Sequence, residues 1–140
     1  MTKNCIRAEP FIATRNQHLS ELAEDYVEII ADLIRLKGKA KTCDIAKQLG
    51  VSHVTVIRTL ERLRQKNLLV ADKGPITLTS EGKELADFCK ARHLFLVEYL
   101  LALGVPEPIA IIDVEGLEHH VSPTTLKAFK KHLKSITPIK

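Results

Sequence analysis

The residues with the most evident chemical potential lie in one short stretch, IIDVEGLEHH, which runs from Ile111 to His120. Within it, Glu115, Glu118 and His119 are spaced i, i+3 and i+4. On a helix, with about 100° per residue, their side chains share one arc. Carboxylates this close raise each other's pKa unless a cation or a base neutralises them. The spacing therefore favours a cation site, although a solvated acidic face remains an alternative.

Two other places in the sequence carry side chains of the same kind. Asp25 and Glu28 stand at i and i+3 beside the apolar stripe of an expected helix, and His93 follows Arg92 in a later one. An Asp-x-x-Glu pair is most often a solvated face, and a single helical histidine is most often packed or exposed. Cys89, one turn before His93, could offer a softer ligand to zinc or iron, but a packed thiol is the favoured interpretation.

The composition is that of an ordinary globular protein. The 140 residues include 45% hydrophobic and 27% charged residues, enough for one sizeable core or a small domain with a helical partner. No apolar run approaches the roughly 18 residues of a membrane-spanning helix, and the first residues do not resemble a signal peptide. Three scattered cysteines indicate reduced thiols, so we expect a cytoplasmic protein without a membrane partner. The formal charge of +4 is compatible with a nucleic-acid partner but does not require one.

The first half of the chain has the pattern of a winged helix-turn-helix. A helix is expected over residues 19–37, a short helix over 42–49, a turn at Gly50 and a second helix over 52–66, capped by Ser52. The predicted shared core consists of Ile45, Leu49, Val51, Val56, Leu60 and Leu63, and Ala46 is small where the two helices must cross closely. Strand-like runs at 68–72 and 76–79 flank Lys73-Gly74-Pro75 and predict a hairpin wing. A helical packing unit without a role in nucleic-acid binding is the alternative interpretation.

The second half is expected to be entirely helical. Helices are predicted over residues 80–103, 106–121 and 123–133, the last one capped by Ser122 and opened by Pro123. The predicted fold class is mainly α, with an N-terminal winged helix-turn-helix followed by an all-helical domain. The expected division is a flexible arm over 1–17, a winged helix-turn-helix domain over 18–82, and an all-helical domain over 83–140.

The order of these segments resembles one known family. EDYVEII in the first helix, then the helix-turn-helix and wing, ARHLFLVEYLLALGV and DVEGLEHHVSP are similar to the manganese-dependent transport regulators of the diphtheria-toxin-repressor family. The similarity covers residues 19–129. It implies a homodimeric, metal-activated transcription regulator and no enzyme. It also implies that residues 18–82 form the DNA-binding domain and residues 83–140 the dimerisation and metal-binding domain. The metal ligands that it implies are Asp25, Glu28, His93, Glu115, Glu118 and His119.

Two of these positions bear on the choice of metal. In the iron-responsive branch of the family, the places that match Asp25 and Glu115 carry Met and Cys, whereas both are carboxylates here. Oxygen ligands suit Mn²⁺, which binds weakly in the divalent series and is selected by geometry and availability. Four carboxylates and two imidazoles could balance two divalent ions per subunit, with Fe²⁺, Zn²⁺ or Cd²⁺ as substitutes. The expected function is repression of manganese-uptake genes.

For double-stranded DNA, the second helix of the motif would enter the major groove. The residues expected nearest the bases or phosphates are Ser52, His53, Thr55 and Arg58. The residues expected to contact only the sugar-phosphate backbone of the DNA are Lys41, Arg62, Arg64 and Lys73. Two symmetric copies imply a palindromic operator.

Two other classes of protein compete with this interpretation. A dimetal carboxylate enzyme would use a Glu-x-x-His pair on each of two helices, which this chain lacks. A winged-helix regulator that senses a small organic ligand would need no metal. The expected partners are DNA and a second copy of the chain, with no small organic substrate.

Overall fold

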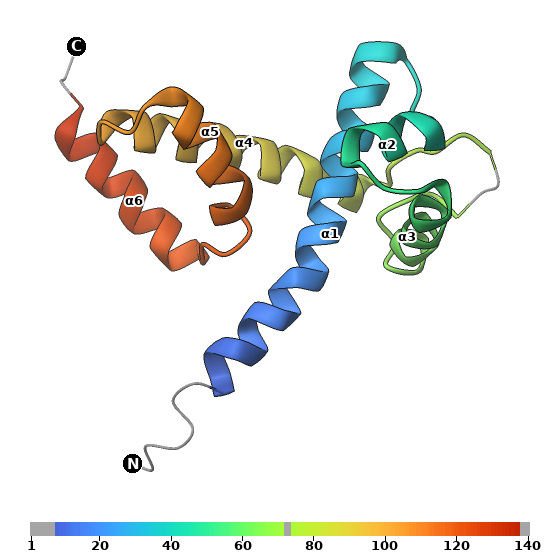
Figure 1. Cartoon of the computed structure of the whole chain (residues 1–140), viewed down its shortest axis with the longest axis horizontal. Coiled ribbons are helices and arrows are strands. Elements are labelled where there is room, and N and C mark those ends of the chain that lie inside the picture. Colours follow the sequence, from blue (N-terminus) through green and yellow to red (C-terminus); the bar gives the residue numbers. More distant parts are fainter. Residues whose placement is uncertain (1–7, 72–73, 138–140) are drawn as a thin grey trace. The chain divides into compact units, whose positions relative to one another are not determined.

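The computed structural model describes residues 8–71 and 74–137, which form six helices (Figure 1). They are α1 (Ala8–Lys37), α2 (Thr42–Leu49), α3 (His53–Gln65), α4 (Ser80–Ala102), α5 (Glu107–Leu117) and α6 (Pro123–Ile136). β-structure within the described ranges consists of two isolated antiparallel bridges. The mainly α fold class is therefore confirmed. In this part of the chain, no helix is both long and apolar enough to span a membrane.

The described residues divide into two compact units. One is Glu21–Cys89, which we call the winged unit; the other, the helical unit, comprises residues 8–20 and 90–137. Both dividing points fall inside helices, α1 and α4, whereas the sequence suggested a boundary between residues 82 and 83. The first half of α4 belongs to the winged unit because Leu85 and Ala86 pack against its core.

The first helix begins earlier than the sequence predicted. We expected a flexible arm over residues 1–17 and a helix from Leu19, but α1 already begins at Ala8. Residues 8–17 lack an apolar period, and for this reason the sequence predicts an arm there. A helix does not need an apolar stripe, however, and Pro10 is tolerated in a first turn. Residues 1–7 lie outside the described residues.

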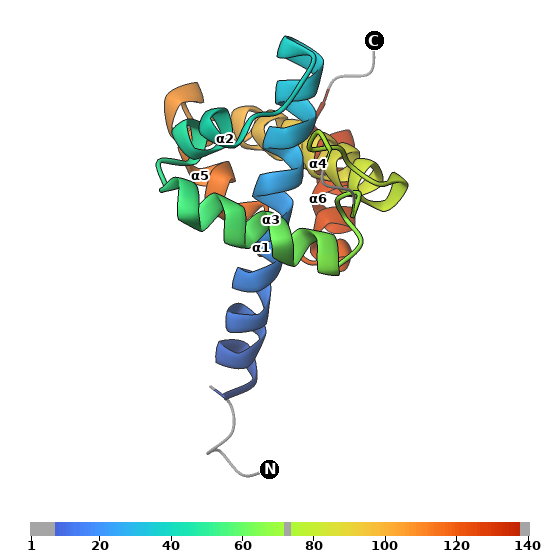
Figure 2. The same ribbon diagram turned by 90° about the vertical axis from the view of Figure 1, so that its right-hand side faces the viewer.

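The winged unit contains the predicted helix-turn-helix, α2 followed by α3 (Figure 2). Gly50 adopts φ 66° in the turn between them, a conformation that suits glycine. Ser52 Oγ accepts a hydrogen bond from Thr55 N at 3.2 Å and so caps α3 as expected. The prediction that Val51 belongs to the shared core is wrong, since Val51 is exposed on the turn itself. The core of this unit is Ala23, Tyr26, Val27, Ile30, Leu33, Ala40, Ile45, Ala46, Val56, Leu60, Leu63, Leu69, Leu78 and Ala86.

The wing is shorter than the predicted pair of strands. Leu69 pairs with Leu78 in one bridge, and Val70 N donates to Thr77 O at 3.0 Å. A second bridge joins Ile76 to Ala40, a pairing that the sequence did not suggest. Antiparallel pairing across the wing is thus present, but as single bridges. Gly82 in the first turn of α4 approaches the wing so closely that a Cβ there would lie 2.2 Å from Leu68 O.

The helical unit has a small core shared by three helices. Leu96 of α4, Val114 of α5 and Leu126 of α6 are buried together. Tyr99 adds an aromatic contact, with its ring centroid 4.8 Å from that of Phe129. Helix α6 begins after Ser122, whose Oγ accepts a hydrogen bond from Thr125 N at 3.2 Å.

Candidate metal centre and nucleic-acid interface

The clearest polar cluster of the helical unit surrounds the carboxylate of Glu118. Glu118 Oε2 lies 2.6 Å from Nδ1 of His93 on α4, and Glu118 Oε1 lies 3.5 Å from Nε2 of His119. Both Glu118 and His119 are 2% exposed, and His93 is half-buried. The structure therefore brings together three of the predicted ligands, which come from two different segments of one unit.

The chain path after α5 explains why these side chains are buried. We predicted that the helix would continue to residue 121, but α5 ends at Leu117 and the chain turns through residues 118–120. Glu118 N still donates to Val114 O at 2.9 Å, which keeps it at the helix end. The turn buries Glu118 and His119, while His120 is exposed. Glu115, one turn earlier on α5, is also exposed. The three residues that were expected to share one helical arc, Glu115, Glu118 and His119, therefore differ in burial.

Burial dominates the electrostatics of Glu118. Desolvation raises the pKa of its carboxyl group, and the hydrogen bond to His93 and the charges of both histidines lower it only in part. The nearby carboxylate of Glu115 raises the pKa further. A buried carboxylate of this kind gains most from a neighbouring cation, because the cation offsets the charge that burial disfavours.

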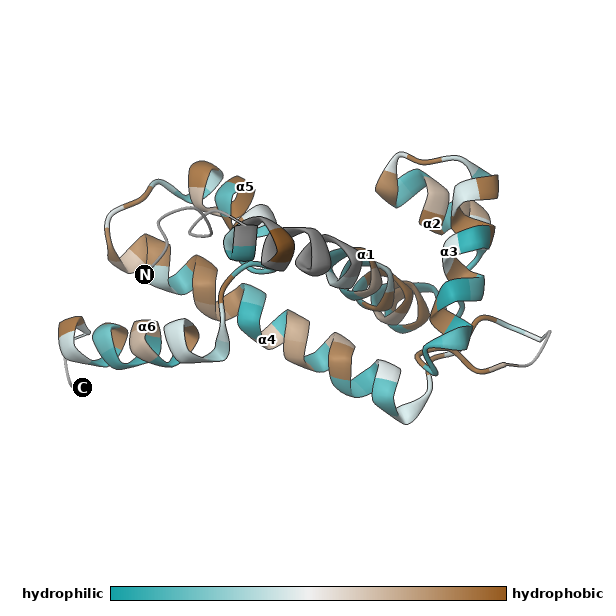
Figure 3. Cartoon of the chain, turned by 90° about the horizontal axis from the view of Figure 1, so that it is seen from below, coloured by the Kyte–Doolittle hydropathy of each residue, from teal (hydrophilic) through white to brown (hydrophobic). Residues whose placement is uncertain are grey.

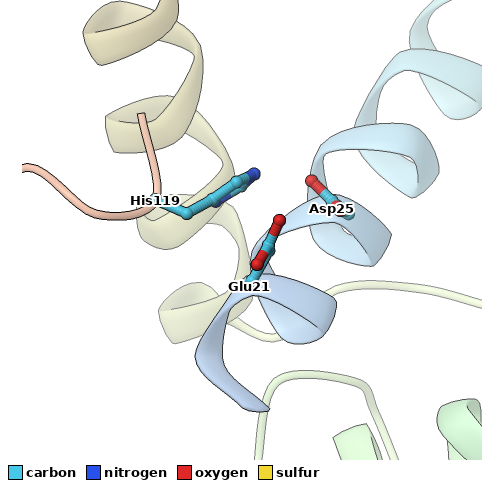
Figure 4. A group of neighbouring side chains, drawn as sticks. All are labelled: Glu21, Asp25 and His119. Carbon is cyan, nitrogen blue, oxygen red and sulfur yellow. The ribbon is translucent and has the colours of Figure 1, made fainter. Parts of the chain in front are cut away.

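The second group of acidic residues lies on α1 in the winged unit. Asp25 and Glu28 are both half-buried, and Glu28 Oε1 is inaccessible to solvent. Figure 4 shows Glu21 and Asp25 projecting from one side of α1, and it also draws the imidazole of His119. A carboxylate oxygen of Glu21 lies within 4.8 Å of one of Asp25.

Sequence reasoning missed two acidic residues of α1. Glu21 precedes Asp25 by four residues, and that i, i+4 spacing was the signal that could have revealed it. Glu24 is 8% exposed, and its Oε2 accepts a hydrogen bond from Cys89 Sγ at 3.6 Å. Cys89 is fully buried in this contact, as expected for a packed thiol.

The donor groups fit a hard divalent cation. In the helical unit, a buried carboxylate beside two imidazoles offers oxygen and nitrogen ligands. In the winged unit, Glu21 and Asp25 of α1 offer carboxylate oxygens. Oxygen and imidazole donors suit Mn²⁺, Fe²⁺ and Zn²⁺, and carboxylates in particular suit Mn²⁺. The residues present are therefore compatible with a bound metal ion of this class.

The residues predicted to contact DNA lie mostly on exposed parts of α2 and α3. The exposed ones are Lys41, Ser52, His53, Thr55, Arg58 and Arg62. Arg64 is only half-buried and lies 3.5 Å from Glu61, which ties it to its own helix. Lys73 lies outside the described residues.

A hollow lies between α3 and α1 within the winged unit. It has a volume of about 430 Å³, and Arg58 and Arg62 of α3 line it together with Asp25 of α1. A predicted metal ligand and two predicted DNA-binding arginines therefore border the same hollow.

These features define a class of protein. A winged helix-turn-helix with an exposed basic helix is typical of sequence-specific DNA-binding proteins. In the helical unit, a buried carboxylate beside two imidazoles offers donor atoms that suit a divalent metal ion. Together they indicate a DNA-binding regulator that responds to metal.

Comparison with known proteins gives the family. Residues 18–74 match the iron dependent repressor, N-terminal DNA binding domain. Residues 79–137 match the iron dependent repressor, metal binding and dimerisation domain. The chain belongs to the iron-dependent repressor family and carries both of its characteristic domains.

Individual relatives agree with this assignment. The transcriptional regulator MntR of Escherichia coli O6:H1 is 46% identical over 124 residues, covering 87% of this chain and 79% of the relative. The HTH-type transcriptional regulator MntR of Bacillus subtilis is 36% identical over 127 residues, covering 81% and 89%. These relatives are transcriptional regulators, which supports a regulator over a dimetal carboxylate enzyme.

Solved structures share the fold. One, described as the manganese regulator SloR, aligns with a TM-score of 0.71 at 27% identity, covering 80% of this chain and 53% of that one. Another, a manganese-dependent transcriptional repressor in complex with manganese, aligns with a TM-score of 0.70 at 28% identity, covering 79% and 52%. The chain thus spans about half the length of these two solved proteins.

Proposed function

We propose that this protein is a manganese-activated transcription repressor that binds a palindromic operator as a homodimer in the cytoplasm and controls manganese-uptake genes. The observation that carries the proposal is the buried carboxylate of Glu118, held between His93 and His119. In a metal-binding domain, this arrangement supplies ligands that gain free energy when a cation neutralises them.

The proposed ligands are Asp25, Glu28, His93, Glu115, Glu118 and His119, with two ions per subunit. Carboxylates at positions 25 and 115 favour manganese, because a hard ion prefers oxygen over sulfur donors. The relatives named as manganese regulators are consistent with this choice. A bound Mn²⁺ ion supplies positive charge that offsets the carboxylates.

Metal and DNA binding are linked in this proposal through the ligands of α1. Asp25 borders the same hollow as Arg58 and Arg62, so a change in the charge of Asp25 acts next to the DNA-binding helix. Asp25 and Glu28, two of the proposed ligands, belong to the winged unit, so metal binding by them would favour one state of the unit that carries α3. A ligand shifts such an equilibrium only by binding one state more tightly than another.

A homodimer is supported by the apolar surface of the helical unit. Leu94 is 59% exposed, Ile109 is 50% exposed and Ile112 is 72% exposed. Large apolar side chains with this much exposure are often covered by a partner protein. The family model that matches residues 79–137 describes a metal binding and dimerisation domain.

The decisive experiment adds Mn²⁺, Fe²⁺ or Zn²⁺ in turn to metal-free protein and measures binding to DNA from a manganese-uptake promoter. We expect Mn²⁺ to tighten binding to the promoter but not to a scrambled duplex of equal length. Equal affinity for the promoter with chelator and with saturating Mn²⁺ would reject the proposal. Binding without metal that responds to a small organic ligand would favour the competing class of regulator.

A further inference from the structure

Helix α6 carries a stripe of lysines that the proposed function does not use. Lys127, Lys130, Lys131 and Lys134 are spaced i, i+3, i+4 and i+7 and all are exposed. With about 100° per residue, these four positions fall within one arc of about 100°. The sequence of α6, PTTLKAFKKHLKSI, contains no acidic residue that could neutralise them. We call these four residues the α6 lysine stripe.

The apolar side of α6 is already occupied. Leu126 is buried, and Phe129 packs against the core of the helical unit beside Tyr99. Figure 3 shows the resulting alternation of hydrophobic and hydrophilic residues along α6. Lys130 Nζ lies 5.5 Å from the centroid of the Phe95 ring, which fixes one edge of the lysine stripe relative to the core. The lysines therefore form a rigidly carried, exposed surface and not a mobile tail.

The chemistry of this surface selects a polyanion. A basic amphipathic helix can bind membranes, but it does so by inserting its apolar face. On α6, Leu126 and Phe129 of that face pack against the core of the helical unit. Lysine ammonium groups act as point charges and bind phosphates without reading sequence. Duplex DNA presents a regular array of phosphates, and this chain carries a DNA-binding domain in its other unit.

We propose that the α6 lysine stripe is a second DNA-binding surface that contacts duplex phosphates without regard to sequence. It adds affinity, whereas α3 provides specificity. The inference rests on the proposed DNA-binding function, but it assigns a role to a helix outside the winged unit. It applies to any duplex that the protein engages, whether or not the duplex contains an operator.

The test compares two charge-matched variants of the full-length protein at saturating Mn²⁺. Lys127→Gln/Lys131→Gln removes two charges from the stripe. Lys83→Gln/Lys90→Gln removes two charges from exposed positions of α4. Affinity for fluorescent promoter DNA and for a scrambled duplex is measured at several salt concentrations, and thermal unfolding verifies that both variants fold.

The expected result is a smaller salt dependence for the stripe variant on both duplexes. Each lost phosphate contact lowers the slope of log K against log salt by about 0.9. If the dimer loses one or two phosphate contacts per subunit, the magnitude of the slope of log K against log salt concentration should fall by roughly 1.8 to 3.6. The control variant should change the slope less, and both variants should keep the wild-type ratio of affinities for promoter and scrambled DNA.

Slopes that are equal for the stripe variant and the control would overturn the proposal. So would a loss confined to the promoter, because it would indicate a sequence-specific role. Vesicles containing phosphatidylserine provide a further comparison: binding that depends on the stripe, without a change in DNA slope, would assign the surface to membranes instead. A missing Mn²⁺ response would reject the proposed metal activation but would leave the comparison of slopes between variants valid.

Discussion

Glu118→Gln is the substitution that most directly tests the metal centre. The amide has nearly the same size as the carboxylate, so the packing around the buried side chain is retained. What disappears is the negative charge beside His93 and His119. Because both histidines are proposed ligands, one substitution alters the donor itself and its contacts with two others.

In the metal-free protein, two opposing effects set the change in the free energy of unfolding that Glu118→Gln causes. A hydrogen bond to a charged group contributes about 1.5–3 kcal/mol, and its loss destabilises the fold. Burial of the carboxylate costs free energy, as its raised pKa indicates, and the neutral amide avoids that cost. We therefore expect the free energy of unfolding without metal to change by less than about 1.5 kcal/mol.

Metal binding should respond far more strongly. Loss of an outer-shell partner of a metal ligand typically costs about 10–100-fold in affinity. Loss of a charged ligand that also contacts two others should exceed that range, so we expect at least about 100-fold more Mn²⁺ to be needed for operator binding. Operator binding measured during a Mn²⁺ titration gives this value, and thermal unfolding without metal gives the stability.

The matched control is Glu107→Gln, which removes the same charge from an exposed position in the first turn of α5. It should respond to Mn²⁺ like the wild type. If Glu118→Gln also required no more Mn²⁺ than wild type, Glu118 would not be a ligand and the assignment of the centre would be wrong. If it unfolded at much lower temperature without metal, its weaker response would reflect the fold instead.

Three other predictions concern selectivity, packing and assembly. Replacing Asp25 by Met together with Glu115 by Cys should shift activation from Mn²⁺ towards Fe²⁺, because sulfur is a softer donor; an unchanged preference in operator binding would contradict this. Gly82→Ala should destabilise the protein by about 1–3 kcal/mol, because the added Cβ would overpack against Leu68 O. Gly116→Ala, whose Cβ would meet nothing within 4 Å, should be neutral or stabilising. Thermal unfolding of the two variants measures the difference, and equal melting temperatures would refute the close approach of Gly82 to Leu68. Metal-free protein should sediment as a dimer at micromolar concentration, since its exposed apolar surface is independent of metal, and a monomer would disprove this.

Local signals were sufficient for most of the helices. Glycine at position 50 and Ser52 indicated the turn and the cap of α3, because backbone conformation and capping depend on neighbouring residues only. The start of α1 was missed because residues 8–17 lack the apolar period on which the prediction relied. The end of α5 was also missed: the apolar stripe runs on to Val121, but the chain turns after Leu117.

The types of candidate ligand were evident from the sequence, whereas their environments were not. Spacing alone placed Glu115, Glu118 and His119 on one arc, yet burial separates the first from the other two. That separation arises because the chain turns after α5, which sequence periodicity cannot reveal. The contact of Glu118 with His93 likewise joins residues 25 positions apart.

The sequence by itself determined the order of elements, the mainly α class and the types of donor atom in the candidate site, since these depend on periodicity, turn residues and side-chain identity. Only the tertiary structure decided that Glu118 is buried between two histidines and that Glu24 accepts a hydrogen bond from Cys89. It also decided that the wing pairs with Ala40 and that Gly82 must lack a Cβ beside Leu68. These outcomes depend on contacts between distant segments, which form only when the chain packs, and no local pattern encodes them.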